Sequence, residues 1–302
     1  MTKEQEKQYW KGNRMKTEHV NWGLVAFIDL LGYSAQVLSL TTVEELKSLE
    51  NKIKYIQEVF EYSSKDDIEE GHSYIDKHVQ AFSDCVVINI SMDSESTRIA
   101  GNFDPILGEV HMLGIAQSMC IHEKTFIRGG IDIGLYYFNN NRFISPAMVN
   151  AYRLENRMIE PVIGISDELY EFFRNHPDNS CYGEDESPVS SIFRNGRNSK
   201  NEVITFIDYV SIGIDVQDWK TSEEQMIEYR KASSDERNRI MTDGYDSNSI
   251  AWLNVHSKAV VEAYTSSENE KVKSKYRWLA NYHNEVIHEY GGKYDECIIV
   301  LE

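Results

Sequence analysis

The sequence has few cysteines and prolines, and it contains no long apolar run. Of its 302 residues, 4 are cysteine and 5 are proline. No stretch approaches the about 18 uninterrupted apolar residues that a membrane-spanning helix needs, and the charged N-terminus fits neither a secretion signal nor a membrane anchor. We therefore expect a cytoplasmic protein with reduced, structural cysteines, because no CxxC pair occurs among Cys85, Cys120, Cys181 and Cys297.

Basic residues are also scarce. Lys and Arg number 31 against 49 Asp and Glu, which gives a net charge of −18. This excess of negative charge argues against a broad grip on a phosphate backbone, so we expect no nucleic acid and no membrane as partners. A nucleoside triphosphate remains open as a substrate, because bound cations would be the largest local charges in such a site.

Several familiar motifs are absent. The sequence contains no GxxxxGK[ST], GxGxxG or GxSxG, so P-loop ATPases, Rossmann dehydrogenases and α/β-hydrolases have no support. Its histidines form neither HxH nor HExxH, which makes a zinc site improbable. The 41% of hydrophobic residues is nevertheless enough to bury a core, so we expect a folded, soluble protein.

The first half of the chain predicts six elements in the order β, α, β, β, α, β. Apolar and β-branched runs predict the strands, and apolar residues at helical spacing predict the helices. The order is ferredoxin-like and predicts an α+β fold with its helices on one face of an antiparallel sheet. The expected elements are strands at 23–31, 73–82, 85–90 and 126–138, and helices at 34–62, broken near Thr41, and at 106–124.

The second half predicts a mainly helical end. A helix at 145–158 and a strand and helix within 162–173 precede a polar stretch, 175–201, which predicts a long loop. A strand at 203–214 and helices at 223–239, 249–266 and 272–290 follow. We divide the chain into an N-terminal segment (1–20), a main domain (21–215) and a helical C-terminal extension packed on the core (216–302).

Two acids in this pattern predict a metal site. Asp29 ends a buried strand and Asp84 lies at a hairpin tip, 55 residues later (84 − 29), yet neighbouring central strands would bring them together. Hard divalent cations prefer carboxylate oxygens, and a pair of such ions suits phosphoryl transfer. For either acid alone, a helix cap or a turn is the simpler interpretation.

The flanking residues of both acids resemble one family. FIDLLGYS (27–34) resembles the F-x-D-I-x-G-F-T signature of class III adenylate and guanylate cyclases, and FSDCVV (82–87) is similar to their metal-binding turn. RGGIDIG (128–134) and SPAMVNAYRLE (145–155) follow in the family's order. KYRWLANYHN (275–284) resembles the ending of the pyrimidine (uridylate or cytidylate) cyclase branch of the Pycsar antiphage defence system. The resemblance covers about residues 20–165 and that late helix.

The resemblance implies a set of site residues. Residues 21–215 would form the nucleotidyl cyclase domain, a phosphorus–oxygen lyase that acts as a homodimer with composite active sites. Two divalent cations, Mn²⁺ or Mg²⁺, would be bound by Asp29, Asp84 and the backbone carbonyl of Leu30. The turn after the first strand would cradle phosphates, since backbone N–H groups at a helix start bind anions. The implied substrate-binding residues are Phe27, Leu31, Gly32, Tyr33, Gln80 and Arg128.

The implied catalytic residues are Arg153 and Asn150. Arg153 stands where the family has an arginine that stabilises charge on the α-phosphate. Aligning the RLE segment puts Val149 where the family asparagine belongs, so either Asn150 replaces it or the ribose is held differently. The simpler interpretations are an arginine on an exposed helix face for Arg153 and a surface residue at a strand end for Arg128.

Base selection is predicted from one departure. Purine cyclases have a lysine four residues before the second metal-binding acid, where this chain has Gln80. An amide both donates and accepts, which suits the edge of a pyrimidine, although the same residue fits an exposed strand. The resemblance thus implies conversion of UTP, or secondly CTP, to the 3′,5′-cyclic monophosphate and pyrophosphate.

The product would be a second messenger of antiphage defence that reaches an effector without direct binding between the proteins. Two alternatives remain open at this point. One is an adenylate or guanylate cyclase with divergent base recognition. The other is a catalytically inactive cyclase-like domain that senses a nucleotide.

Overall fold

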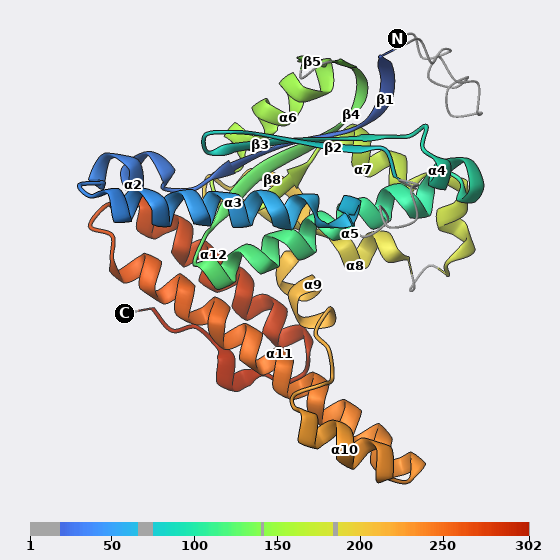
Figure 1. The fold of residues 1–302 in the computed structure, drawn as a ribbon, viewed down its shortest axis with the longest axis vertical. Helices are drawn as coiled ribbons and strands as arrows, with labels where there is room; N and C mark the ends of the chain where they lie inside the picture. Colours follow the sequence, from blue (N-terminus) through green and yellow to red (C-terminus); the bar gives the residue numbers. More distant parts are fainter. Residues whose placement is uncertain (1–18, 66–74, 140–141, 184–186, 302) are drawn as a thin grey trace.

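The computed structural model describes residues 19–65, 75–139, 142–183 and 187–301. Its strands form one mixed sheet in the order β2-β3-β1-β4-β6-β8-β7, with β5 paired to β4 (Figure 1). The predicted N-terminal segment, except for its last two residues, lies outside the described part. The strands are β1 (Val20–Leu30), β2 (Lys77–Phe82), β3 (Cys85–Ser91), β4 (Ile127–Asn139), β5 (Arg142–Ile144), β6 (Ile163–Ile165), β7 (Phe193–Arg197) and β8 (Val203–Ile207).

The predicted βαββαβ order is confirmed. β1 lies between β3 and β4 and is antiparallel to both, and β2 pairs antiparallel with β3 at the edge. The first helix is broken as expected, into α2 (Tyr33–Ser39) and α3 (Val43–Lys65), and α5 (Phe103–Cys120) is the second long helix. The structure is therefore an α+β fold with a ferredoxin-like core and additional helices at its C-terminal end.

The two faces of the core are covered differently. α3 and α5 lie on one face, where Ile131 and Ile133 of β4 join the largest apolar cluster (Figure 1). α6 (Pro146–Arg157) lies on the other face, across β4 and β1. Gly130 and Gly134 allow this close approach, because a Cβ atom at Gly130 would lie 2.3 Å from the backbone oxygen of Ala151.

The predicted loop at 175–201 is wrong in part. It contains a short 3₁₀ helix, η3 (Pro177–Cys181), the helix α8 (Pro188–Ile192) and the edge strand β7. Val189, Ile192 and Phe193 are buried there, and this apolar run is too short to show a period among its polar neighbours. Within the same stretch, residues 184–186 lie outside the described part.

Helix boundaries near the C-terminus also differ from the prediction. The strand predicted at 203–214 ends at Ile207, where Asp208 caps the next helix. The helix predicted at 223–239 is broken, because α10 ends at Lys231. Ser233 and Glu236 then form a capping box that starts α11 at Ser234, 15 residues before the predicted start at 249 (249 − 234). The remaining elements are α4 (Glu95–Ala100), η2 (Ile121–Glu123), α7 (Asp167–Arg174), α9 (Tyr209–Asp215), α10 (Glu223–Lys231), α11 (Ser234–Thr265), α12 (Glu270–Glu289) and η4 (Asp295–Cys297).

The C-terminal helices share an apolar cluster with the end of the sheet. α11 and α12 pack on each other and on α9, and Phe206 of β8 lies edge-on to Trp278 of α12. α10 projects away from the sheet (Figure 1). Among the described residues, no helix is long and apolar enough to cross a bilayer.

Two stacked histidines lie inside this helical layer. The rings of His256 in α11 and His283 in α12 are 4.9 Å apart and nearly parallel, and neither residue is exposed. His283 Nε2 donates to the Cys297 carbonyl at 3.0 Å, and His256 Nε2 is 2.8 Å from the Tyr209 hydroxyl. Burial lowers the pKa of His256 well below its ordinary value and that of His283 to about 4.

These histidines predict a loss of stability in mild acid. Unfolded histidine takes up a proton below about pH 6.5, whereas the buried pair stays neutral, so protons favour unfolding as the pH falls from about 6.5 to about 4. We expect the free energy of unfolding, measured by urea titration, to fall less steeply over this range in His283→Gln. The exposed-site control His122→Gln should match the wild type; equal slopes in all three proteins would contradict the assignment.

Candidate active site

The core strands bring the two predicted acids together. In the register of β1 and β3, Asp29 lies opposite Cys85, and the tight turn places Asp84 next to both. The backbone N–H of Leu30 donates to the carbonyl of Asp84 at 3.0 Å, which ties the end of β1 to the hairpin tip. One ligand atom from each of Asp29, Asp84 and Cys85 lies within 4.8 Å of the others.

Arg128 and Glu155 extend this group across the sheet. Arg128 of β4 lies opposite Asp29 in the register, and its Nη2 atom is 3.4 Å from Asp29 Oδ2. The same Nη2 atom forms an ion pair with Glu155 of α6. Arg128, a predicted substrate ligand, is thus paired with two carboxylates of its own chain.

The charges of this group are crowded. Burial raises the pKa of Asp29, Arg128 lowers it, and the neighbouring Asp84 carboxylate raises it again. Burial likewise raises the pKa of Glu155, against the lowering effect of Arg128. Because a raised pKa reports a carboxylate whose negative charge is poorly compensated, the site favours a bound cation.

Cys85 has the properties of a neighbour rather than a ligand of a hard cation. Its Sγ atom is 3.9 Å from a carboxylate oxygen of both Asp29 and Asp84. Burial and the nearby acids raise the pKa of the thiol to about 12, so it stays protonated. Hard divalent cations prefer oxygen, and the two carboxylates supply it, so the residues present fit magnesium or manganese.

A second cation reaches the group from the far end of the sequence. Burial and then Arg128 lower the pKa of Lys275 in α12, whereas Glu160, Asp29 and Glu155 raise it, which places Lys275 within electrostatic range of all four. The edge-on contact of Tyr276 with Phe126, at 5.1 Å, anchors this part of α12 to the start of β4. Lys275 and Glu155 stand at the ends of two stretches that resemble the cyclase family, but neither was among the predicted site residues, since tertiary packing brings them to this group.

The turn after β1 leads through a glycine into a helix, as expected of a phosphate-binding loop, but two of its backbone N–H groups are already used in hydrogen bonds within the chain. Gly32 has φ of +82° and directly precedes α2. The N–H groups of Leu30 and Leu31 already donate to the carbonyls of Asp84 and Phe126. Any anion contact would therefore fall to Gly32, Tyr33 and Ser34.

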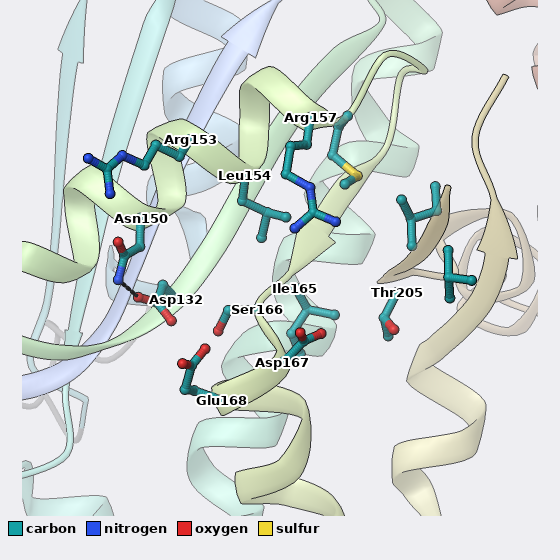
Figure 2. Close-up of a pocket in the computed structure, with 13 residues that line it drawn as sticks. Asp132, Asn150, Arg153, Leu154, Arg157, Ile165, Ser166, Asp167, Glu168 and Thr205 are labelled. Carbon is teal, nitrogen blue, oxygen red and sulfur yellow. Dashed lines mark hydrogen bonds between the residues drawn. The ribbon is translucent and has the colours of Figure 1, made fainter. Parts of the chain in front are cut away.

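Asn150 and Arg153 lie in a different place, a cavity of about 300 Å³ beside α6 (Figure 2). Asn150 Nδ2 donates to Asp132 Oδ2 at 3.0 Å, and Arg153 follows one turn later on the same side of the helix. Val149, which aligns with the family asparagine, is exposed and does not line the cavity. The residue that lines the cavity together with Arg153 is Asn150. Asp132 was not among the predicted site residues, although it alternates with Gly130 and Gly134 in RGGIDIG.

The carboxylate group and the cavity use different faces of α6. Asn150, Arg153, Leu154, Arg157 and Met158 recur at three- and four-residue spacing and line the cavity. Glu155 is two residues after Arg153, about 200° around the helix, and points to Arg128. One chain therefore does not join Arg153 to the Asp29 and Asp84 carboxylates.

Phe27 and Gln80 lie on the α6 side of the sheet without lining that cavity. Phe27 packs edge-on against Tyr152 of α6, with ring centres 5.2 Å apart. Gln80 of the edge strand β2 lies opposite Val87, which lies opposite Phe27. Their predicted contacts with substrate stay predictions.

No protein-family model and no curated protein sequence matches the chain. Among solved structures, the adenylyl cyclase CyaB from P. aeruginosa is 16% identical, with 62% of this chain and 93% of that chain covered and a TM-score of 0.40. The guanylate cyclase domain of RhGC from Catenaria anguillulae, in complex with GTP, is 13% identical (63% and 97% covered, TM-score 0.40). A class III adenylyl cyclase-like ATP-binding protein from Pseudomonas aeruginosa is 12% identical (50% and 34% covered, TM-score 0.37). Identities this low say nothing about activity.

The geometry of the carboxylate group predicts which side chains hold a metal. At a Mn²⁺ concentration about a hundredfold above Kd, binding should stabilise the fold by about 2.7 kcal/mol. We expect this gain, measured by thermal denaturation, in the wild type and in Cys85→Ser, and its loss in Asp84→Asn. A Cys85→Ser protein that no longer responds to Mn²⁺ would show that the thiol is a ligand.

Proposed function

We propose that this protein is a metal-dependent nucleotidyl cyclase that converts a pyrimidine nucleoside triphosphate to its 3′,5′-cyclic monophosphate and pyrophosphate. The observation that carries the proposal is the meeting of Asp29 and Asp84 at the ends of neighbouring central strands. Both acids stand within the two stretches that resemble the metal-binding motifs of class III cyclases. A helix cap or a simple turn explains neither their proximity nor their crowded charge.

The reaction closes a ring within one nucleotide. The 3′-oxygen forms a bond to the α-phosphorus, the bond from that phosphorus to the bridging oxygen breaks, and pyrophosphate leaves with the electron pair. The proton of the 3′-hydroxyl passes to solvent. Divalent cations bound by Asp29 and Asp84 would supply the Lewis acid that lowers the pKa of this hydroxyl and neutralises the triphosphate.

The remaining roles fall to side chains on α6. In this proposal the Arg153 guanidinium stabilises the charge that develops on the α-phosphate, and Asn150 holds the ribose. Arg128 stays paired with Glu155 and balances the acids when Asp29 binds metal. Gly32 and Tyr33 offer their N–H groups to the phosphates.

We infer that a complete active site needs two copies of the chain. Arg153 and the carboxylates lie on different faces, so the arginine of one copy would serve the metal site of the other. Apolar side chains exposed beside these residues support a contact between copies, since they would be buried in it. They include Phe82 at 58% exposure, Val149 at 49% and Tyr152 at 51%.

The choice of base rests on Gln80 and on the stretch 275–284, which resembles the pyrimidine branch. We propose UTP as the first substrate and CTP as the second, because an amide matches the mixed donors and acceptors of a pyrimidine edge. By the same resemblance, the product would serve as a messenger of antiphage defence that acts on a separate effector.

The reaction is tested by incubating the purified chain with Mn²⁺ and each of ATP, GTP, CTP and UTP, and identifying products by mass spectrometry. We expect cyclic UMP or cyclic CMP, and no product from Asp29→Asn. Glu171→Gln, which removes the same charge from an exposed site on α7, should match the wild type. Formation of cyclic AMP or cyclic GMP would contradict the proposed preference for pyrimidines. If no nucleotide gave a cyclic product, the proposal that this protein is a cyclase would be wrong.

The composite site predicts complementation between two inactive variants. Asp84→Asn and Arg153→Gln should each abolish turnover, but a mixture restores one intact site in each mixed dimer. If subunits exchange freely, half of the dimers are mixed, so about a quarter of the wild-type activity should return. Absence of recovery in a mixture shown by mass measurement to contain mixed dimers would contradict the composite site.

A further inference from the structure

A carboxylate occupies a position on β4 where packing favours an apolar side chain. Residues 130, 132 and 134 point to the same side of the strand, toward α6, because side chains alternate along a strand. Gly130 and Gly134 leave no side chain there, and Asp132 between them is 3% exposed. The neighbouring Ile131 and Ile133 face the apolar cluster on the other side. Asp132 is thus the one side chain that this part of β4 presents beneath α6.

One of the two carboxylate oxygens of Asp132 is satisfied and the other is not. Oδ2 accepts from Asn150 Nδ2 at 3.0 Å. Oδ1 is buried and has no hydrogen-bond partner among the residues that the structure describes. A buried acceptor without a partner is costly, so a hydrogen-bond donor that reached Oδ1 would stabilise this position.

The cavity around Asp132 has two electrically different sides. Arg153 and Arg157 line the cavity from α6, with the Arg157 guanidinium pointing toward Asp167 and the Arg153 guanidinium pointing outward at the edge, whereas the carboxylates of Asp132, Asp167 and Glu168 come from β4 and the start of α7 (Figure 2). Phosphates would be attracted to the arginines and repelled by the acids. A nucleotide in this cavity would therefore turn its uncharged nucleoside toward Asp132.

We propose that Asp132 is a substrate-binding residue whose free Oδ1 accepts a hydrogen bond from the nucleoside, through either a ribose hydroxyl or a base N–H. The inference rests on the proposed function, since it places the nucleoside of that substrate. Oδ2 has a second role: a carboxylate only accepts, so it fixes the amide of Asn150 with its NH₂ toward Asp132 and its carbonyl oxygen turned away. Asp132 thus both contacts the nucleoside and orients the residue that holds the ribose.

Asp132→Asn separates these two roles. The oxygen of the new amide can still accept from Asn150, but its NH₂ group then stands where the free acceptor was, and it cannot accept. Loss of a hydrogen bond to a charged group corresponds to a loss of about 10- to 100-fold in affinity. We expect this loss for α,β-methylene-UTP with Mn²⁺, measured by isothermal titration calorimetry, and no change in Glu171→Gln.

Modified nucleotides test the same contact in the wild-type protein, without any risk of misfolding. The 2′-deoxy and 3′-deoxy forms of the analogue remove ribose donors, and the N3-methyl form removes the base donor. The form that lacks the contacting group should bind about 10- to 100-fold more weakly to the wild type. It should lose little further in Asp132→Asn, because both changes remove one interaction.

Several outcomes overturn the inference. The inference is wrong if the wild-type protein binds all three modified nucleotides as tightly as the unmodified analogue. It is also wrong if Asp132→Asn binds the unmodified analogue as tightly as the wild type does, because Oδ1 would then accept no hydrogen bond from the nucleoside. If UTP is still cyclised in either case, the proposed function stands and only the role of Asp132 is lost. A wild-type protein that binds no nucleotide removes both.

Discussion

The antiparallel pairing of β1 with β3 and β4 is the constraint on which the rest of the site depends. It sets Asp29 opposite Cys85 on one side and opposite Arg128 on the other, so acid, thiol and guanidinium form one row across the sheet. A slip of one residue in either register would turn these side chains to the face covered by α3 and α5. The buried apolar residues that fix the register therefore also fix the site.

The same pairing separates the two halves of the proposed chemistry. α6 crosses β4 on glycines, which brings the helix close enough for Glu155 to reach Arg128 and for Asn150 to reach Asp132. Because the cavity face of α6 turns away from Asp29, close packing within one chain keeps Arg153 from Asp29 and Asp84, the acids proposed to bind metal. A second chain is the simplest way to bring the two together.

The features that could be predicted from the sequence are those that depend on short patterns of residues. The βαββαβ order and the break between α2 and α3 follow from short patterns of neighbouring residues. The proximity of Asp29 and Asp84 follows from that order, because it makes β1 and β3 neighbours in the sheet. Glu155 and Lys275 could not be predicted as site residues, because they depend on how α6 and α12 dock. Asp132 was within reach: an acid flanked at two-residue spacing by glycines marks a strand face that packs closely around one polar group. The loop assignment at 175–201 failed because three apolar residues are too few to show a period.

The charges beside Asp29 and Asp84 differ from what the net charge of the chain would suggest. A chain with a net charge of −18 still places a guanidinium from β4 and an ammonium from α12 beside its crowded acids. Both cations are partly buried, so solvent screens them less than it screens the exposed acids that dominate the total. The fold thus places two basic side chains, Arg128 and Lys275, where the carboxylates of Asp29 and Glu155 meet. The charges nearest to this row of side chains therefore dominate the potential there, so the net charge of the whole chain is a poor guide to what binds at it.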